Sequence, residues 1–414
     1  MTLSENLRWR GLIKDKTFED DSWLDEPKTF YLGTDCSSDS LAIGNLAIYM
    51  LARHLMEAGW KAVLLVGGAT SLIGDPGGKD EERQLKTREE IEYNVASVKA
   101  QVRRLFADNE FDLVDNYDWF KDIGYLEFLR DVGKHFSMTE LVQRDFIATR
   151  MGEGGAGISY AEFSYNLIQG YDYYWLHKNK GVVLQIGGSD QWGNMLSGAP
   201  LIRKKDGDIV HALSMPLVIN KITGKKFGKS EEGAVWLDPA QTTPTQFYQF
   251  WINVDDGSVE DYLKIYTMLS KEDIEQIIAE HQQKPAERHA QRRLAQEVTA
   301  LVHGENEMHI AEQVTDYITG RASVGEANDA ALAALRKEMS AAKVSETALL
   351  TQVLVTVGLA SSNSDARQLL AGGAVYINGT ATNKNALESN DFQNGRLLIR
   401  KGKVLKNTAL IERM

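Results

Sequence analysis

The strongest constraint on the fold is an alternation of short apolar runs with amphipathic stretches across residues 29–219. Three apolar runs end in glycine or polar turns and predict buried strands, at residues 30–34, 62–67 and 182–186. Apolar residues at helical spacing predict helices between these strands, at residues 46–58 and 88–106. Because strands alternate with helices, we predict an α/β fold with a doubly wound parallel sheet.

Such a sheet also predicts where a ligand binds. Ligands of doubly wound sheets lie beyond the carboxyl ends of the strands. Three segments lie at or just after predicted strand ends, at residues 33–35, 68–75 and 187–191. We therefore expect these three segments to surround one crevice.

The pattern changes along the rest of the chain. Residues 259–269, 271–282 and 285–302 have apolar residues at helical spacing and predict an α-helical region. Residues 322–342 are rich in alanine and predict either a helix or a loose connector. The last part predicts a small α+β unit, with helices at 347–357 and 362–370 and strands at 374–378 and 397–400. The first of these strands ends in a turn at Asn378–Gly379.

The composition excludes several classes of protein. No apolar run approaches the length of a membrane span, and residues 1–10 lack the apolar core of a signal peptide. Cys36 is the only cysteine, which excludes an internal disulfide and a multi-cysteine zinc site. We expect a cytoplasmic protein without a membrane partner.

The net charge of −12 is unevenly distributed. Residues 344–414 contain eight Lys and Arg against five Asp and Glu, and residues 395–406 contain five basic residues and no acidic one. A local basic surface can bind phosphates although the whole chain is acidic, because salt screens distant charges. A solvated pair of strands explains the same charges equally well.

The first segment with chemical features is residues 31–45 (YLGTDCSSDSLAIGN), a strand followed by a polar turn and a helix that begins near Gly44. The unpaired N–H groups and positive dipole end of a helix N-terminus attract phosphate. Many helices follow strands without binding phosphate, so this segment alone is weak.

The second segment is glycine-rich, at residues 66–83 (VGGATSLIGDPGGKDEER). Asp75 lies in a turn of this segment, and Lys79 and Arg83 follow it. Glycines at a strand end allow a ligand to approach the backbone closely. A surface loop with an Asx-turn explains the same residues.

The third segment, residues 165–172 (YNLIQGYD), has a polar stripe. Tyr165, Gln169 and Asp172 lie at i, i+4 and i+7, which is one face of a helix. A core helix would have leucine or valine at these positions, so the stripe indicates a polar pocket rather than packing.

The fourth segment, residues 184–194 (LQIGGSDQWGN), is an apolar strand followed by two glycines, Ser189, Asp190 and Gln191. The glycines allow a flat ligand to lie on the backbone. The carboxylate and the amide can hold a ribose and a polar substrate group. Trp192 is expected to be a core residue.

The fifth segment, residues 225–230 (KKFGKS), places three lysines around a glycine, including Lys226 and Lys229. Few apolar residues lie nearby, which predicts a mobile cationic loop. A run of charge is usually only a solvated face, and alone this segment indicates no more.

Together and in this order, the five segments resemble the class I aminoacyl-tRNA synthetases, and specifically the bacterial type of tyrosyl-tRNA synthetase. Residues 41–45 occupy the His-Ile-Gly-His signature, and residues 226–230 occupy the Lys-Met-Ser-Lys-Ser signature. Tryptophanyl enzymes have similar signatures. Tyr31, the polar stripe and GGSDQWGN are the features that are similar to the tyrosyl enzymes. The resemblance extends from residues 7–12 (LRWRGL) to the C-terminal unit.

The resemblance implies a domain organisation and a reaction. The domains are a Rossmann-like catalytic domain (1–220), the lysine loop with a helical tRNA-contacting domain (221–325), a linker (326–344) and an S4-like RNA-binding domain (345–414). Tyrosine reacts with ATP to give tyrosyl-adenylate and pyrophosphate, and is then transferred to the terminal ribose of tRNA(Tyr). The implied partners are L-tyrosine, ATP, tRNA(Tyr) and a second copy of the chain, with residues 125–150 near the dimer interface. Mg²⁺ arrives with ATP, and neither a tightly bound cofactor, a metal site of the protein, nor DNA is implied.

The resemblance also assigns residues to each substrate. Tyrosine is assigned to Tyr31, Asp75, Tyr165, Gln169 and Asp172. ATP is assigned to Gly33, Asp35, Gly44, Asn45, Lys79, Arg83, Gly188, Asp190, Lys226 and Lys229. Catalytic roles fall to Ser37, Asn45, Gln191, Lys226 and Lys229. The basic tail implies tRNA contacts at Arg396, Arg400, Lys401 and Lys403.

The chain departs from the family at the first signature. The first signature histidine is Ala42, and the second is Asn45, which keeps a hydrogen-bond donor. In the preceding turn, Cys36 and Ser37 stand where the family has proline and threonine. Losing a donor such as the histidine removes about 2–4 kcal/mol of transition-state stabilisation.

Three hypotheses remain open on the sequence alone. The first is a working synthetase in which other groups compensate for Ala42. The second is a catalytically impaired relative that acts as an RNA-binding protein in splicing or regulation. The third is a different nucleotidyltransferase on the same scaffold.

Overall fold

The structure is a computed structural model of the chain, which forms two compact units. It describes residues 1–75, 86–143, 145–152, 155, 157–221, 224, 227–230, 233–402 and 404–414, with only the main chain of 145, 146, 229 and 230. The first unit consists of Met1–Gln241 and Asp255–Ala290, and the second of Thr242–Val254 and Gln291–Met414.

A parallel sheet forms the centre of the first unit. Its strands are β1 (Thr29–Asp35), β2 (Lys61–Gly67), β3 (Phe111–Asp115), β4 (Leu184–Gly188) and β5 (His211–Met215), in the order β3-β2-β1-β4-β5. Every neighbouring pair is parallel, which confirms the predicted α/β sheet. The chain proceeds from β1 in one direction and from β4 in the other. The switch point of the fold therefore lies between β1 and β4, where such sheets bind ligands.

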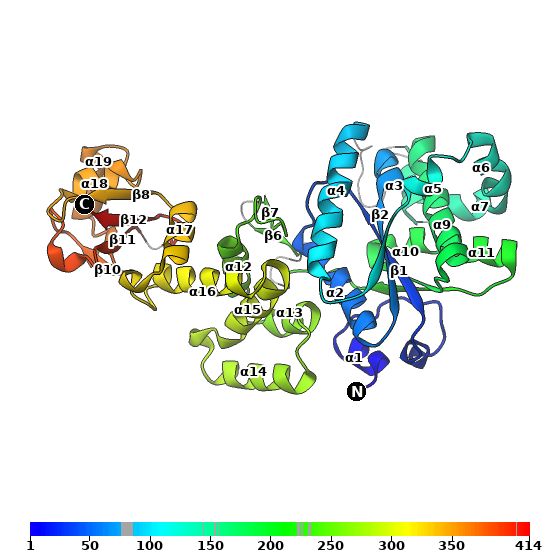
Figure 1. Cartoon of the computed structure of the whole chain (residues 1–414), viewed down its shortest axis with the longest axis horizontal. Coiled ribbons are helices and arrows are strands. Elements are labelled where there is room, and N and C mark those ends of the chain that lie inside the picture. The colour runs from blue at the N-terminus through cyan, green and yellow to red at the C-terminus, as the bar shows by residue number, and fades with distance from the viewer. Residues whose placement is uncertain are drawn as a thin grey trace. The chain divides into compact units, whose positions relative to one another are not determined.

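Helices cover both faces of this sheet, with α2 (Ile43–Glu57) and α4 (Arg88–Leu105) on one side and α9 (Tyr160–Lys180) and α11 (Gly198–Asp206) on the other (Figure 1). Tyr31, Val63 and Leu65 pack in one apolar cluster with residues of α9 and α11. The other helices of this unit are α1 (Leu3–Trp9), α3 (Gly68–Ile73), α5 (Tyr117–Phe120), α6 (Tyr125–Asp131), α7 (Met138–Val142), α8 (Asp145–Met151), α10 (Trp192–Met195), α13 (Val259–Tyr266) and α14 (Lys271–Gln283). A short hairpin is formed by β6 (Lys229–Ser230) and β7 (Gly233–Ala234).

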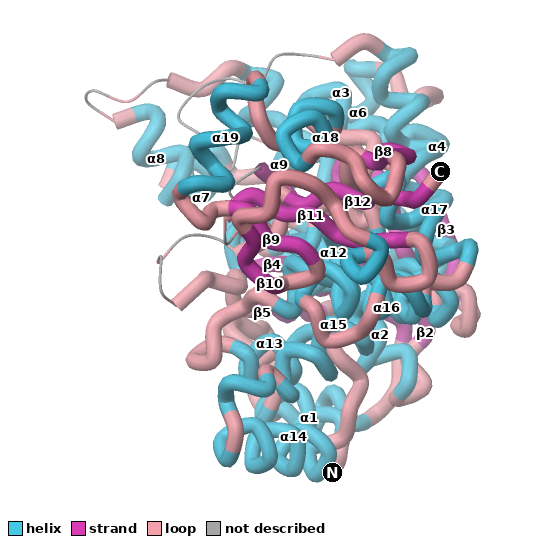
Figure 2. The backbone as a smooth tube through the Cα atoms, turned by 90° about the vertical axis from the view of Figure 1, so that its left-hand side faces the viewer, coloured by secondary structure: helices cyan, strands magenta, loops and turns pink. Residues whose placement is uncertain are grey.

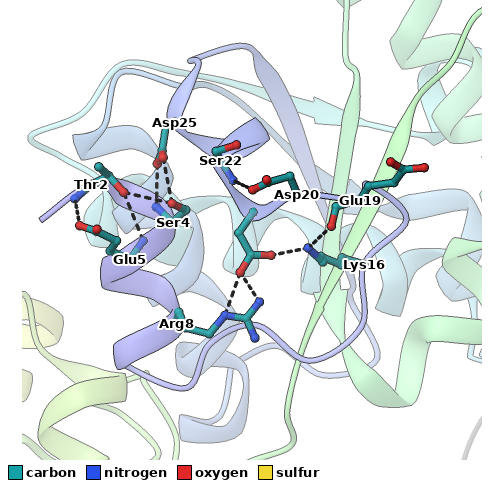
Figure 3. Close-up of polar contacts among 10 residues, drawn as sticks. Thr2, Ser4, Glu5, Arg8, Lys16, Glu19, Asp20, Ser22 and Asp25 are labelled. Atoms are coloured by element: carbon teal, nitrogen blue, oxygen red, sulfur yellow. Dashed lines mark hydrogen bonds and ion pairs between the residues drawn. The ribbon is translucent and has the colours of Figure 1, made fainter.

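The N-terminal helix is attached to the unit by polar contacts (Figure 3). Ser4 donates two hydrogen bonds to Asp25, of 2.8 and 2.9 Å. Arg8 and Lys16 both form ion pairs with Asp21. These contacts hold the segment before β1 in place without adding a strand.

The second unit combines helices with a mixed sheet. Its helices are α12 (Pro244–Ile252), α15 (His289–His303), α16 (Glu305–Thr319), α17 (Asp329–Glu338), α18 (Leu350–Thr356) and α19 (Asn363–Ala371). Its strands are β8 (Ala341–Val344), β9 (Val375–Ile377), β10 (Thr380–Thr382), β11 (Arg396–Lys401) and β12 (Thr408–Arg413), in the order β10-β9-β11-β12-β8. Figure 2 shows α18 and α19 beside the strands of this sheet. Asn378 and Gly379 join β9 to β10 with positive φ angles of 47° and 84°, which confirms the predicted turn.

Side-chain alternation buries both faces of this second sheet. Leu397, Ile399 and Ile411 pack against α18 and α19. Leu398 and Leu410 point the other way and pack with α16 and α17. The stretch expected to be a linker therefore contains α17 and β8, which share a core with the C-terminal strands.

None of the described helices is long and apolar enough to cross a membrane.

Candidate active site

A cavity of about 500 Å³ opens at the carboxyl ends of β1 and β4, beside the switch point of the first sheet. The three segments expected to surround one crevice all contribute to its wall. The predicted residues that line it are Tyr31, Gly33, Asp35, Ser37, Gly44, Asn45, Asp75, Tyr165, Gln169, Asp172, Gly188, Asp190 and Gln191. Ala42, which replaces the signature histidine, also lines it.

Tyr31 and Asp172 form a deeply buried end of this cavity. The Tyr31 side chain is 1% exposed, and its hydroxyl has no hydrogen-bond partner among the described residues. Asp172 accepts hydrogen bonds from Trp119 Nε1 (2.9 Å) and Asn116 Nδ2 (3.1 Å). A buried polar group without a partner is rare in folded proteins, so the Tyr31 hydroxyl indicates a place for a polar ligand atom.

Burial raises the pKa of Asp172 to about 8, and the nearby charges of Asp35 and Asp115 add to this rise. The hydrogen bonds from Trp119 and Asn116 act in the opposite direction. In the free protein the carboxyl therefore keeps its proton at neutral pH, when it can donate as well as accept.

Tyr165 and Gln169 lie one turn apart on α9, which begins after the N-cap Ser159. The Tyr165 hydroxyl donates to Asp35 Oδ2 (2.8 Å), and Thr70 donates to Asp35 Oδ1 (2.7 Å). Burial, followed by the charges of Asp35 and Asp75, raises the pKa of Tyr165 well above its usual value. The Oε1 atom of Gln169 is buried without a hydrogen-bond partner in the described structure, so this amide also has capacity for a ligand.

Asp75, Gln191 and Asn194 form a closed set of hydrogen bonds. Gln191 Nε2 donates to Asp75 Oδ2 (2.6 Å), and Asn194 Nδ2 donates to Asp75 Oδ1 (3.1 Å) and Gln191 Oε1 (3.0 Å). The Asn194 amide donates both of its N–H groups, one to Asp75 and one to the Gln191 oxygen. The Gln191 oxygen therefore faces Asn194, and the Gln191 nitrogen faces Asp75. Asn194 thus orients two residues that face the cavity.

The helix α2 begins at the cavity wall with Ala42 as its N-cap. The Ala42 side chain cannot accept a hydrogen bond. Instead, Asn45 Oδ1 accepts from the main-chain N–H of Ala42 (3.0 Å). The helix begins one residue before the predicted Gly44, and Asn45 stabilises its first turn.

The described part of the lysine loop contacts this helix end. A Cβ atom at Gly228 would lie 3.2 Å from the main-chain nitrogen of Gly44, and the φ of Gly228 is 107°. Only glycine fits this close approach and this φ angle. Phe227 stacks on Tyr262 of α13 with ring centroids 4.3 Å apart.

Several predicted residues are not described in detail. Lys79, Arg83, Lys226 and Lys403 lie outside the described residues. Lys229 belongs to β6, where only the main chain is described.

Three of the predicted tRNA residues, Arg396, Arg400 and Lys401, lie on β11 of the second unit. Arg396 donates to the carbonyl of Ala327 (2.6 Å). Arg400 donates to the carbonyl of Gly402 (3.2 Å) and lies over the Tyr376 ring. Both arginines share the strand face of Leu398, which packs with α16 and α17. Lys401 is half-buried at the end of the strand.

Four polar side chains that bind predicted site residues were not themselves predicted: Thr70, Asn116, Trp119 and Asn194. Asn116 directly follows β3, a strand that the sequence pattern did not indicate. Predicting that strand would have placed Asn116 at the carboxyl edge of the sheet.

No cluster of three His, Cys, Asp or Glu side chains is arranged to hold a metal ion in the part of the chain that the structure describes. Three carboxylates that line the cavity bind different partners: Asp35 binds Tyr165 and Thr70, Asp75 binds Gln191 and Asn194, and Asp172 binds Trp119 and Asn116.

Comparison with known proteins places the chain in a family. Residues 24–318 match the family "tRNA synthetases class I (W and Y)". Residues 331–411 match the "Tyrosine–tRNA ligase SYY-like C-terminal domain".

Individual proteins show the same relationship. The chain is 40% identical to a tyrosine–tRNA ligase of Bacteroides thetaiotaomicron over 422 residues, which cover 97% of this chain and 98% of that protein. It is 40% identical to tyrosine–tRNA ligase 2 of a Bacillus cereus strain over 423 residues, which cover all of both chains. Among solved structures, the truncated mitochondrial tyrosyl-tRNA synthetase of Aspergillus nidulans matches with a TM-score of 0.68 and 30% identity, over 75% of this chain and 92% of that one. The resemblance predicted from the five segments is thus confirmed, and the chain belongs to the tyrosine–tRNA ligases, a family of class I tRNA synthetases.

Proposed function

We propose that the buried end of the cavity binds the phenol of tyrosine between Tyr31 and Asp172. The observation that carries this proposal is the Tyr31 hydroxyl, which is buried without a partner among the described residues. A ligand hydroxyl would supply that partner and also contact the Asp172 carboxyl. Phenylalanine would leave the Tyr31 hydroxyl without a partner, at a cost of about 1–3 kcal/mol, and would lose the contact with Asp172. Tyrosyl-tRNA synthetases are the standard example of such discrimination, so the size of the preference is not a new prediction.

The opposite end of the amino acid lies toward Asp75 and Gln191 in this proposal. Asp75, Tyr165 and Gln169 receive the ammonium group. Asp75 offers a carboxylate and Tyr165 a hydroxyl oxygen. Gln169 offers a buried amide oxygen, which itself has no hydrogen-bond partner among the described residues. Gln191 orients the substrate carboxylate with its remaining N–H.

ATP occupies the part of the cavity between β1, β4 and the start of α2. Glycines and carboxylates there accommodate the adenosine and its ribose, at Gly33, Asp35, Gly188 and Asp190. The N-terminus of α2 supports phosphate binding at Gly44 and Asn45, since its N–H groups and dipole attract anions. Ser37 lies on the same wall. Lys79, Arg83, Lys226 and Lys229 are proposed to neutralise the phosphates, on the strength of the family resemblance alone.

The reaction is an in-line displacement at the α-phosphorus. The tyrosine carboxylate forms a bond to phosphorus as the bond to pyrophosphate breaks, and pyrophosphate leaves with the electron pair. Positioning and charge stabilisation account for most catalysis of this kind. In a second step, a ribose hydroxyl of tRNA(Tyr) attacks the acyl carbon and AMP leaves. Mg²⁺ is proposed to arrive with ATP and to neutralise phosphate charge, because Mg²⁺ in such sites is usually bound by substrate phosphates together with one or two carboxylates.

The second unit is proposed to bind tRNA in the cytoplasm, with an S4-like fold in its C-terminal part. Support comes from residues 344–414, which contain eight Lys and Arg against five Asp and Glu, and from the match of residues 331–411 to a tyrosine–tRNA ligase C-terminal domain. Lys401 is a better candidate for phosphate contacts than Arg396 and Arg400, whose guanidinium groups are engaged within the fold. Lys403 is proposed on its charge alone.

We also propose that the chain forms a homodimer through residues 125–150. Among the described residues in this stretch and the ten that follow it, five large apolar side chains are between 55% and 78% exposed: Tyr125, Leu126, Met138, Met151 and Tyr160. Such a gathering of exposed apolar groups is typical of an interface. Sedimentation of the wild type and of Leu126→Glu tests this, since a charge at a buried interface should give monomers. A wild type that sediments as a monomer would rule it out.

Calorimetric titration with tyrosine and with phenylalanine tests the proposed pocket. Saturable binding of tyrosine, with much weaker binding of phenylalanine, is expected. Equal affinity for the two amino acids would overturn the assignment of Tyr31 and Asp172.

A further inference from the structure

The turn from Cys36 to Leu41 connects β1 to the start of α2, and its Ser37 lines the part of the cavity proposed to bind ATP. A turn of this length has many conformations, and the position of α2 relative to β1 depends on which one is fixed. The side chains that fix it belong to other elements. Ser71 of α3, for example, accepts a hydrogen bond from the main-chain N–H of Cys36 (2.7 Å).

Helix α4 presents two buried amides to this turn. Asn94 and Gln101 lie seven residues apart, which is the same face of a helix, and are 5% and 6% exposed. Asn94 Nδ2 donates to the carbonyl of Cys36 (2.9 Å). Gln101 Nε2 donates to the carbonyl of Asp39 (3.0 Å), and Gln101 Oε1 accepts from the N–H of Leu41 (2.9 Å). The two amides therefore hold both ends of the turn.

Hydrogen bonds also connect this turn and α4 to Leu237 and Asp238, which follow the lysine loop. The Ser40 hydroxyl lies 3.3 Å from Gln101 Oε1 and accepts from the N–H of Asp238 (3.2 Å). The carbonyl of Leu41 accepts from the N–H of Leu237 (2.8 Å). Arg104, one turn further along α4, donates to the carbonyl of Leu237 (3.2 Å).

We propose that Asn94 and Gln101 are positioning residues for ATP, which act through the main chain of residues 36–41. Neither lines the cavity, so they are not catalytic residues. Their loss would let the turn adopt other conformations and would shift Ser37 and the first turn of α2. Tyrosine binding would be spared, because its proposed contacts come from β1, α9 and the residues around Asp75 and Gln191. This inference rests on the proposed place of ATP.

The test compares Gln101→Met with Val102→Ala in the full chain. Gln101→Met keeps the volume and removes the side-chain hydrogen bonds to the turn. Val102 is fully buried on the same helix, so Val102→Ala controls for loss of packing. The measurements are the melting temperature, the Kd for tyrosine, and kcat and KM for ATP in tyrosine-dependent pyrophosphate exchange.

Gln101→Met should lower kcat/KM for ATP by between about tenfold and a hundredfold, as expected of small displacements at a reacting centre. Its Kd for tyrosine should stay within a factor of about two of the wild type. Val102→Ala should lower the melting temperature and leave the ATP kinetics unchanged. Equal ATP effects in the two variants, or wild-type kinetics in Gln101→Met, would overturn the proposal.

Asn94→Ala gives an independent test, with the same selective effect on ATP expected, if Gln101→Met does not fold. A double-mutant cycle that combines Gln101→Met with Ser40→Ala gives a further test. If both residues act through the same turn, their effects on kcat/KM for ATP should not be additive. Strict additivity would argue against a common route. Absence of exchange in the wild type would overturn the proposed function itself, and this inference with it.

Discussion

The indole nitrogen of Trp119 donates a 2.9 Å hydrogen bond to Asp172, joining α5 to the polar stripe of α9 across the closed end of the cavity. Asn116 binds the second carboxylate oxygen (3.1 Å) and also donates to Thr70 (3.2 Å). Thr70 in turn donates to Asp35, which accepts from Tyr165. Asp172, at the proposed phenol end, and Tyr165, at the proposed ammonium end, thus belong to one connected network.

The burial of Asp172 predicts a pH dependence of stability. The unfolded chain releases this proton near a pKa of about 3.9, whereas burial raises the pKa in the folded protein to about 8. Between these values the folded state binds more protons than the unfolded state. The free energy of unfolding should therefore fall as pH rises across this window and level off above it. Urea unfolding at several pH values should show a smaller fall for Asp172→Asn, and identical pH dependence in both proteins would contradict this.

Tyr31→Phe should separate binding from stability. The buried hydroxyl has no partner among the described residues of the free protein, so its removal should not reduce the free energy of unfolding. Tyrosine binding should weaken by about 0.5–1.5 kcal/mol, and phenylalanine binding should not weaken. Calorimetry with both amino acids measures this. A similar loss of affinity for both would show that the hydroxyl does not contact the phenol.

Asn194→Ala should affect tyrosine more than ATP. It removes the donor that orients Gln191 and Asp75, and a hydrogen bond to a charged group contributes about 1.5–3 kcal/mol. The KM for tyrosine should rise at least about tenfold, with KM for ATP nearly unchanged. Steady-state exchange kinetics at varied tyrosine and varied ATP provide the measurement. An effect confined to ATP would contradict the proposed orientation of Gln191.

Much of the first unit could be predicted, because its buried strands are continuous apolar runs that end in glycine or polar residues. The strands β1, β2 and β4 and the helices α2, α4 and α9 all lie close to their predicted positions. The strands β3 and β5 were missed, since Phe111–Asp115 contains two acidic residues and His211–Met215 includes polar ones. In β3 the partly exposed edge position allows the acidic residues.

The partners of the site residues could not be predicted, because they depend on tertiary contacts between distant segments. Asn194 donates to Asp75, which is 119 residues away in the sequence. Asn94 and Gln101 look like ordinary polar positions of an amphipathic helix until the turn they hold is known. Leu398 and Leu410 of the second sheet pack against α16 and α17. The amino-acid composition of these segments does not show that they share a core.

Ala42→His should increase the rate of activation. Asn45 Oδ1 caps the helix through the Ala42 N–H, so the Ala42 side chain has no structural role that histidine would disturb. A histidine donor at the outer phosphates should stabilise the transition state by up to about 2–4 kcal/mol. This stabilisation should raise kcat in the exchange reaction and leave KM for tyrosine unchanged. An unchanged kcat would show that other groups already supply this stabilisation.

The most direct test of tyrosine activation by this cavity is exchange of labelled pyrophosphate into ATP by the purified wild-type chain. We expect exchange that requires tyrosine, is not supported by phenylalanine, and is lost when Asp172 and Gln191 are both replaced by alanine. An absence of tyrosine-dependent exchange above background in the wild type would contradict tyrosine activation by this cavity.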